Sequence, residues 1–182
     1  DFILNIRIIS GAGNSAQLAK DLDEGYVVHA SFSPALPKQE EVPPRSLKIV
    51  LDCSGSMTGD SIAQARQAID EILGHLRPQD FFNLVTFGSS SVCAFDHQVV
   101  ADEVNVARIR NTIRNIRADM GGTEMFDALQ KAMDLSGPQG QTDILLITDG
   151  LVWQSDEIIG MARKSGHRLF TVGVGSAVSA SF

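Results

Sequence analysis

The sequence predicts an α/β fold, with a mostly parallel, doubly wound sheet and helices on both of its faces. From residue 47 onward, short runs rich in Val, Ile, Leu and Phe alternate with stretches whose apolar residues recur at helical spacing. A short Gly/Ser connection within this alternation adds one antiparallel edge strand. Such a pattern is typical of strand and helix units that wind about a central parallel sheet.

Four apolar runs are expected to form the parallel strands, at residues 48–51, 82–87, 144–148 and 168–174. Residues 91–95 follow the second run across only Gly88-Ser-Ser90. A connection this short predicts a hairpin, so residues 91–95 should pair antiparallel at the edge of the sheet. The expected architecture is a Rossmann-like sheet, in which the ligand crevice lies at the carboxyl ends of the strands.

Four stretches carry apolar residues at helical spacing and are expected to be helices. They lie within residues 62–76, 106–116, 125–133 and 158–162. Pro78 marks the end of the first helix, because proline cannot continue a helix from its interior.

Residues 1–46 carry a different pattern. Apolar and polar residues alternate at 4–8 and again at 26–32, and a loop containing Gly, Asn and Ser separates the two runs. A polar, Pro-rich stretch follows at 33–44. This part of the chain is expected to form two strands and a linker, and the sequence leaves open whether these strands join the sheet.

Composition fits one globular domain with an additional segment. The 182 residues are 43% hydrophobic and 20% charged, which is enough apolar material for a full core. The formal net charge of −7 argues against a nucleic-acid partner, which needs clustered Lys and Arg. No run approaches the roughly 18 apolar residues of a membrane-spanning helix, so no membrane segment is expected in this chain.

Two cysteines, Cys53 and Cys93, are too few for a disulfide framework in a chain of this size. We expect both thiols to be reduced and buried, which favours a reducing compartment such as the cytoplasm. The chain does not start with Met, so the N-terminus of the full protein is expected to lie outside it, and an extracytoplasmic setting stays open.

Oxygen-bearing side chains gather where the first expected strand ends. Asp52, Ser54 and Ser56 follow the apolar run 48–51 in the pattern Asp-x-Ser-x-Ser. A carboxylate and two hydroxyls are hard ligands, and the small residues between them let the chain curl so that several oxygens face one point. The pattern predicts a strand end that holds a metal ion.

Two later segments supply further oxygens for such a site. Gly121-Gly122-Thr123 opens the third helix, and Asp149 follows the apolar run 144–148. Taken singly, an Asp-Gly after a strand is usually a turn and a Gly-Gly-Thr is usually a helix start. The alternative interpretation therefore makes the two serines helix caps and Asp149 a turn residue.

Together, five of these residues resemble the metal-ion-dependent adhesion site of von Willebrand factor type A domains. They are Asp52, Ser54, Ser56, Thr123 and Asp149. The resemblance implies that both serines touch the metal, that Thr123 does so when a ligand is present, and that both carboxylates hold it directly or through water. It also implies a protein-protein interaction module, in which the cation binds an Asp or Glu carboxylate of a partner protein.

Magnesium is the expected ion, because its octahedral oxygen shell keeps waters and accepts an external carboxylate. Manganese would also fit, and calcium is the third candidate for so compact a site. Four residues near the loops are expected to form a partner-facing rim. They are Met120, Gly121, Gly122 and Trp153. Covering the sheet is the alternative role for Trp153.

A finer resemblance lies in Leu-Asp-Cys-Ser-Gly-Ser-Met at 51–57, in residues 81–95 and in residues 168–176. These segments are similar to the type A domain that follows a VIT, or inter-alpha-trypsin inhibitor-like, region. The resemblance implies that residues 1–46 are the tail of a VIT-like region and that residues 47–182 are the type A domain, without its last helix and strand.

Two alternative functions stay open. A scaffold module with a vestigial metal site would share every motif above. A magnesium-dependent phosphotransfer enzyme would use an Asp at the end of the first strand as nucleophile, with a second Asp two residues on and a Lys nearby. Position 54 is Ser, no Lys neighbours the three loops, and no P-loop motif occurs. We therefore assign no catalytic residue and do not expect an enzyme.

Overall fold

The computed structural model describes residues 15–20, 25–31, 43–138, 142–150 and 155–175. The chain divides into two compact units, Asp1–Val42 and Pro43–Phe182. Each unit is described by itself.

The first unit contains a two-stranded antiparallel sheet formed by β1 (Ser15–Lys20) and β2 (Tyr26–Ser31). β2 lies where the sequence predicts a strand, whereas the strand predicted at 4–8 lies outside the described residues. The prediction of a loop before β2 is wrong at β1. Its residues, Ser-Ala-Gln-Leu-Ala-Lys, carry a single large apolar side chain, so pairing with β2 rather than local pattern makes this segment a strand.

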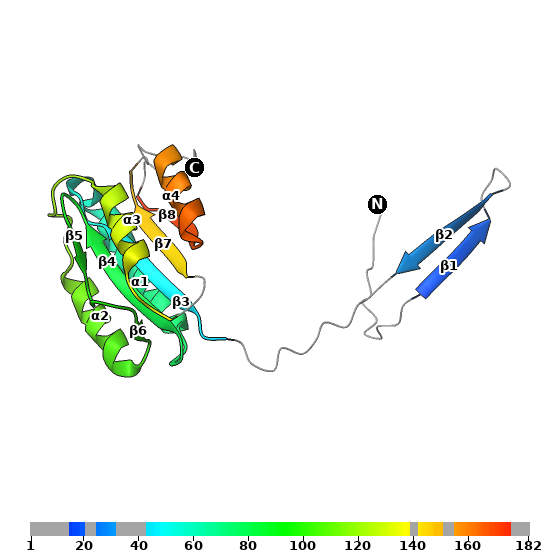
Figure 1. Ribbon diagram of the computed structural model, residues 1–182, viewed down its shortest axis with the longest axis horizontal. Coiled ribbons are helices and arrows are strands. Elements are labelled where there is room, and N and C mark those ends of the chain that lie inside the picture. Colours follow the sequence, from blue (N-terminus) through cyan, green and yellow to red (C-terminus); the bar gives the residue numbers. More distant parts are fainter. Residues whose placement is uncertain (1–14, 21–24, 32–42, 139–141, 151–154, 176–182) are drawn as a thin grey trace, which may run out of the picture. The chain divides into compact units, whose positions relative to one another are not determined.

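The second unit contains a six-stranded sheet. Its strands are β3 (Ser46–Asp52), β4 (Phe81–Phe87), β5 (Ser91–Cys93), β6 (Val99–Val100), β7 (Asp143–Thr148) and β8 (Arg168–Gly173). Along the sheet their order is β5-β4-β3-β7-β8, and β6 pairs with β4 beside this path (Figure 1). β3 is therefore the central strand of the five.

The pairing confirms the predicted fold class. β3 pairs in parallel with β4 on one side and with β7 on the other, and β7 pairs in parallel with β8. β5 returns antiparallel along β4, as the short connection between them predicts. β6 was not predicted, because its two residues are too few to show a strand pattern.

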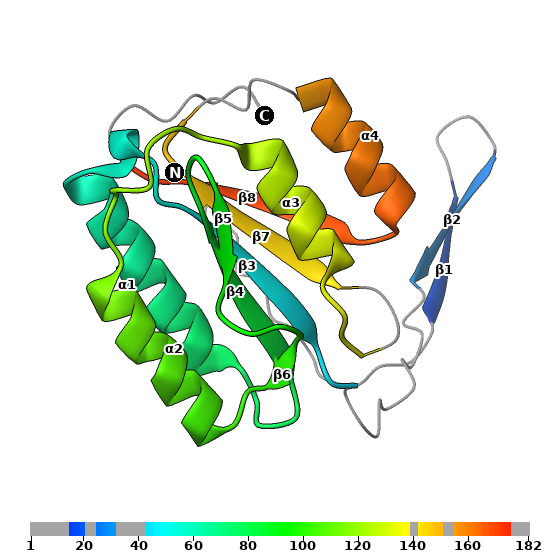
Figure 2. The same ribbon diagram turned by 60° about the vertical axis from the view of Figure 1, so that its left-hand side comes forward.

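Two helices cover each face of the sheet (Figure 2). They are α1 (Asp60–His75) and α2 (Glu103–Asn115) on one face, and α3 (Met125–Asp134) and α4 (Ser155–Ser165) on the other. Successive residues of β3 point to opposite faces: Ile49 and Leu51 belong to the core beside α1 and α2, and Val50 to the core beside α3 and α4. Burial on both faces explains why β3, β4 and β7 are nearly continuous runs of apolar residues, whereas β8 is mostly exposed.

Lys48 is a buried cation within β3, a strand that was predicted as an apolar run. Only 2% of its surface is exposed. Its Nζ donates hydrogen bonds to the carbonyl oxygens of Leu135 at 2.8 Å and Met133 at 3.3 Å, at the end of α3. Burial lowers the pKa of Lys48, and the charge of Asp134 acts in the opposite direction. The lysine thus satisfies carbonyl groups that a helix end leaves without intrahelical donors.

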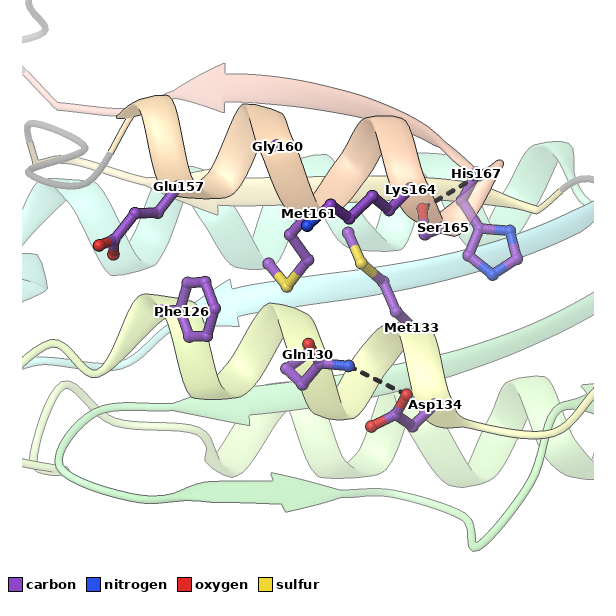
Figure 3. A pocket seen from close by; sticks show the side chains of 10 residues that line it. All are labelled: Phe126, Gln130, Met133, Asp134, Glu157, Gly160, Met161, Lys164, Ser165 and His167. Atoms are coloured by element: carbon purple, nitrogen blue, oxygen red, sulfur yellow. Dashed lines mark hydrogen bonds between the residues drawn. The ribbon is translucent and has the colours of Figure 1, made fainter.

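A cavity of about 890 Å³ lies between α3 and α4. Figure 3 shows Met133 of α3 and Met161 of α4 extending toward one another across it, with His167 at one end. None of the five predicted metal ligands lines this cavity. This cavity is therefore separate from the predicted site.

His167 is expected to make the stability of this fold pH-dependent. Its Nδ1 accepts a hydrogen bond from the Thr142 N–H at 3.3 Å, which requires that nitrogen to be unprotonated. Burial lowers the pKa of His167, and the nearby charge of Lys48 lowers it further. A hydrogen bond with the Met133 backbone raises this pKa, but by less. Because the folded state disfavours the protonated ring, the unfolded state binds more protons below the ordinary histidine pKa of about 6.5.

We therefore expect His167 to contribute stability above about pH 6.5 that is lost as the pH falls toward 5. Urea unfolding of wild type and His167→Gln at both ends of this range measures the effect. The wild type should lose more free energy of unfolding than the variant. An equal loss in both proteins would show that the pH dependence comes from groups other than His167.

Candidate metal centre

Asp52 is the last residue of β3, and two hydrogen bonds fix its carboxylate. Because β3 and β7 are parallel and Leu51 pairs with Ile147, Asp52 lies next to the end of β7. Asp52 Oδ2 accepts a 2.6 Å hydrogen bond from Thr148 Oγ1, and Oδ1 accepts a 2.8 Å bond from the Ser54 N–H. Asp52 is 1% exposed. Each of its oxygens keeps a second lone pair for a cation or a water.

The two serines follow Asp52 in a tight curl. A short 3₁₀ helix, η1 (Gly55–Met57), begins immediately after Ser54, and the Met57 side chain is fully buried beneath it. Ser54 Oγ and Ser56 Oγ share a hydrogen bond at 3.1 Å, and Ser56 Oγ donates to Asp149 Oδ1 at 2.9 Å. The chain fold therefore brings Ser54, Ser56 and Asp149 together, as the sequence predicts.

Thr123 lies on a loop that is bonded to the serine loop through its backbone. The Gly55 N–H donates to the Gly121 carbonyl at 3.0 Å, and the Met120 N–H donates to the Cys53 carbonyl at 3.0 Å. Gly121 has a φ of 82°, a conformation that favours glycine. Thr123 itself is exposed, and among the described residues its hydroxyl makes no hydrogen bond to the other four.

The turn between β4 and β5 holds the Thr123 loop from the other side. Ser89 N–H donates to the Met120 carbonyl at 2.7 Å, and Ser89 Oγ accepts from the Gly122 N–H at 2.7 Å. The Glu124 N–H then donates to the Gly88 carbonyl at 2.8 Å. Sequence reasoning assigned residues 88–90 only to a hairpin turn, because nothing local relates this turn to a loop some thirty residues later.

Thr148 is a second residue that sequence reasoning did not assign to the site. It is 1% exposed, and besides its bond to Asp52 its Oγ1 accepts a 3.2 Å hydrogen bond from the Gly150 N–H. It thus connects Asp52 to the turn that carries Asp149. A hydroxyl residue at a strand end, next to an expected ligand, is the sequence signal that could have identified it.

The donor set fits a small, hard divalent cation. Oxygens at right angles around magnesium, at about 2.1 Å from the ion, lie about 3 Å apart. The separations from Ser54 Oγ to Ser56 Oγ and from Ser56 Oγ to Asp149 Oδ1, 3.1 and 2.9 Å, match this spacing. The described part of the chain contains no group of three or more His, Cys, Asp or Glu residues that could hold a metal. The candidate site is of a different kind, because it combines two carboxylates with hydroxyl groups.

Cys53, inside the serine loop, does not extend the donor set. Burial raises the pKa of its thiol to about 12, and the charges of Asp52 and Asp119 act in the same direction. The group therefore stays a protonated thiol, whereas metals bind the thiolate. Cys53 is 1% exposed, and both Cys53 and Cys93 are free thiols.

The predicted rim is only partly accessible. Gly121 and Gly122 are exposed, whereas Met120 is half-buried and packs against the core beside α1 and α2. Trp153 lies outside the described residues.

Comparison with known proteins identifies the family of this chain. The chain belongs to the von Willebrand factor type A domain family, whose model matches residues 47–182. A von Willebrand factor A domain-containing protein of Dictyostelium discoideum is 34% identical over 166 residues, covering 86% of this chain and 20% of that protein. Inter alpha-trypsin inhibitor heavy chain 4 of Mus musculus is 36% identical over 162 residues, covering 82% of this chain and 16% of that protein.

A solved structure shares the fold. Proximal thread matrix protein 1 from the mussel byssus, in a structure described as having a zinc-occupied MIDAS motif, superposes with a TM-score of 0.57 at 18% identity. The match covers 76% of this chain and 38% of that one. The chain spans about a fifth of the length of the curated relatives it matches. Within the described residues, no helix has the length and apolar character needed to cross a membrane.

Proposed function

We propose that the type A unit binds a divalent cation through Asp52, Ser54, Ser56, Thr123 and Asp149, and that the cation in turn binds a carboxylate of a partner protein. The observation that carries this proposal is the hydrogen-bonded series of oxygens from Ser54 through Ser56 to Asp149. Type A domains are generally non-catalytic interaction modules, which supports binding rather than catalysis as the activity.

The proposed ligands are of two kinds, charged carboxylates and neutral hydroxyls. Asp52 and Asp149 supply two negative charges that balance a divalent cation, while the hydroxyls of Ser54, Ser56 and Thr123 are neutral ligands. The bound cation supplies the positive charge that attracts an external carboxylate. Bonds from Thr148 and the Ser54 N–H orient Asp52 before the cation arrives, which lowers the ordering cost of binding.

Magnesium is the cation we propose, with manganese and calcium as alternatives, because all the donors are hard oxygens. The zinc described for proximal thread matrix protein 1 makes zinc a useful competitor in metal titrations. We also propose that this domain is of the kind that follows a VIT-like region. The similarity to inter alpha-trypsin inhibitor heavy chain 4, at 36% identity, supports this subgroup.

Selection from a displayed library of random peptides tests the proposal without a known partner. On immobilised protein in millimolar magnesium, we expect the enriched peptides to contain an Asp or Glu, and EDTA to release them. Changing that residue to Asn or Gln in a synthetic peptide should abolish binding, because the amide carries no charge. Enrichment that persists in EDTA, or that contains no acidic residue, would refute metal-mediated capture.

Thr123 variants test the open coordination position. Thr123→Ala removes one neutral oxygen but leaves both carboxylates and both serines. We expect the affinity for the acidic peptide to fall about tenfold, equivalent to about 1.4 kcal/mol, and the affinity for magnesium to fall less. Thr123→Ser keeps the hydroxyl and is the matched control, which should retain most of both affinities. Calorimetry measures both, and unchanged peptide binding by Thr123→Ala would place the peptide elsewhere on the domain.

A further inference from the structure

A cleft of about 310 Å³ adjoins the candidate metal centre. Ser56 and Asp149 line it, so the cleft and the cation site share a wall. The other lining residues lie at or just before the start of α1 and just after the end of β8. They are Thr58, Asp60, Ser61, Val174 and Gly175. Residues that flank a carboxylate bound at the cation can therefore reach this cleft.

The end of β8 is bonded to both of its neighbours, which gives the cleft a defined wall. The Val174 N–H donates to the Thr148 carbonyl at 3.1 Å, and the Gly175 N–H donates to Gln64 Oε1 of α1 at 3.0 Å. Gly175 has a φ of 92°, and a Cβ at this position would lie 2.4 Å from Ser61 Oγ. Glycine thus leaves free the space beside Ser61 that any other residue would fill.

The cleft contains a polar group that the fold itself does not use. Ser61 is only 9% exposed and lines the cleft, yet its hydroxyl has no hydrogen-bond partner among the described residues. Because the Ser61 oxygen is not itself enclosed, it can be reached from the cleft and is available to a ligand. Asp60 next to it is exposed and forms no ion pair within the described part of the chain.

The charges of the cleft are all of one sign. Its lining includes Asp60 and Asp149 and no Lys, Arg or His. Once a divalent cation is balanced by Asp52 and Asp149, the carboxylate of a partner and Asp60 add two further negative charges. The N-terminus of α1 contributes roughly half a positive charge, which is too little to balance them. A positively charged group in the cleft would complete the balance.

We propose that this cleft is a second subsite of the same interface and that it binds a basic side chain, Arg or Lys, located within a few residues of the acidic residue that the partner places on the cation. The inference rests on the proposed function, because it needs the cation site to fix the register of the partner. A guanidinium or ammonium group offers several donors, which match the hydroxyls of Thr58 and Ser61 and the Asp60 carboxylate.

The residues that flank the acidic residue in the selected peptides test this inference. The library is selected in magnesium on wild type, on Asp60→Asn and on Glu71→Gln. The last variant removes the same charge from an exposed position further along α1, where Gln67 donates to Glu71. We expect Arg or Lys to be enriched near the acidic residue on wild type and Glu71→Gln. On Asp60→Asn this enrichment should disappear while the acidic residue is still selected.

One selected peptide and its Arg→Gln (or Lys→Gln) form complete the test by calorimetry. On wild type the substitution should weaken binding about tenfold, and on Asp60→Asn it should have little further effect, as expected for two groups in contact. Selection of an acidic residue with no basic neighbour would overturn this inference and leave the proposed function standing. Selection of no acidic residue would overturn both. A second manganese ion bound per wild-type chain and lost in Asp60→Asn would assign the cleft to a metal and overturn the inference.

Discussion

Millimolar magnesium is expected to raise the thermal midpoint of the wild-type chain, and Asp52→Ala is expected to abolish that gain. A ligand that binds only the native state stabilises it by mass action, by about 2.7 kcal/mol at a hundredfold excess over its dissociation constant. Asp52 supplies one of the two negative charges of the site. Its removal leaves a divalent cation with a single carboxylate.

Asp52 is also buried and hydrogen-bonded to Thr148, so Asp52→Ala lowers the midpoint even without metal. The measured quantity is therefore the magnesium-induced shift within each protein. Asp52→Asn keeps the shape and a carbonyl oxygen for the Thr148 hydroxyl, and it should lose the shift with less damage to the fold. Glu71→Ala, at an exposed position of α1, is the control and should keep the wild-type shift. A full magnesium-induced shift in both Asp52 variants would show that Asp52 is not a metal ligand.

Gly88→Ala is expected to displace the Thr123 loop and so to impair both stability and metal binding. A Cβ at Gly88 would lie 2.4 Å from both Met120 Cβ and the Met120 carbonyl oxygen, and 2.7 Å from the Met120 carbonyl carbon. Two of these three atoms are backbone, so the loop itself must move. Overpacking of this kind typically costs about 1–3 kcal/mol, and the displaced loop should carry Thr123 away from the other ligands.

Urea unfolding and magnesium titration together measure this effect. Gly160→Ala is the matched control, because a Cβ at this position of α4 meets nothing within 4 Å. Alanine there should be neutral or stabilising by up to about 1 kcal/mol, as expected for a helix interior. If Gly88→Ala unfolds like wild type and binds magnesium equally well, the turn between β4 and β5 does not position the Thr123 loop.

Local sequence determined most of the sheet and its helices. β3, β4 and β7 are largely buried on both faces and appear as nearly continuous apolar runs, so they could be located from composition alone. β8 also carries an apolar run, although most of its residues are exposed. The amphipathic helices between them carry a single apolar stripe, which makes their period visible. β1 could not be predicted in this way, because one large apolar residue, Leu18, among six shows no period.

The candidate metal ligands could also be chosen from the sequence, for a topological reason. In a parallel sheet the carboxyl ends of neighbouring strands meet at one rim, so Asp52 and Asp149 are close whatever the details of the loops. The long-range hydrogen bonds that hold this site together could not be predicted. Thr148 bonds to Asp52 across 96 positions of sequence, and Ser89 bonds to Gly122 across 33.

The sequence by itself thus determined the fold class and the candidate ligands, because burial of strands and helices produces a periodic pattern of apolar residues along the chain. Only the tertiary structure decided which groups support them. Chain folding brings the Thr148 hydroxyl to Asp52 and the Gly88 carbonyl to the Glu124 N–H. It likewise brings the buried Lys48 amine to the end of α3. The cleft beside Asp149 is of the same kind, since α1 and the end of β8 meet there only in the folded chain. Hydrogen bonds and close contacts depend on distance in space, and residues far apart in sequence leave no local pattern that records it.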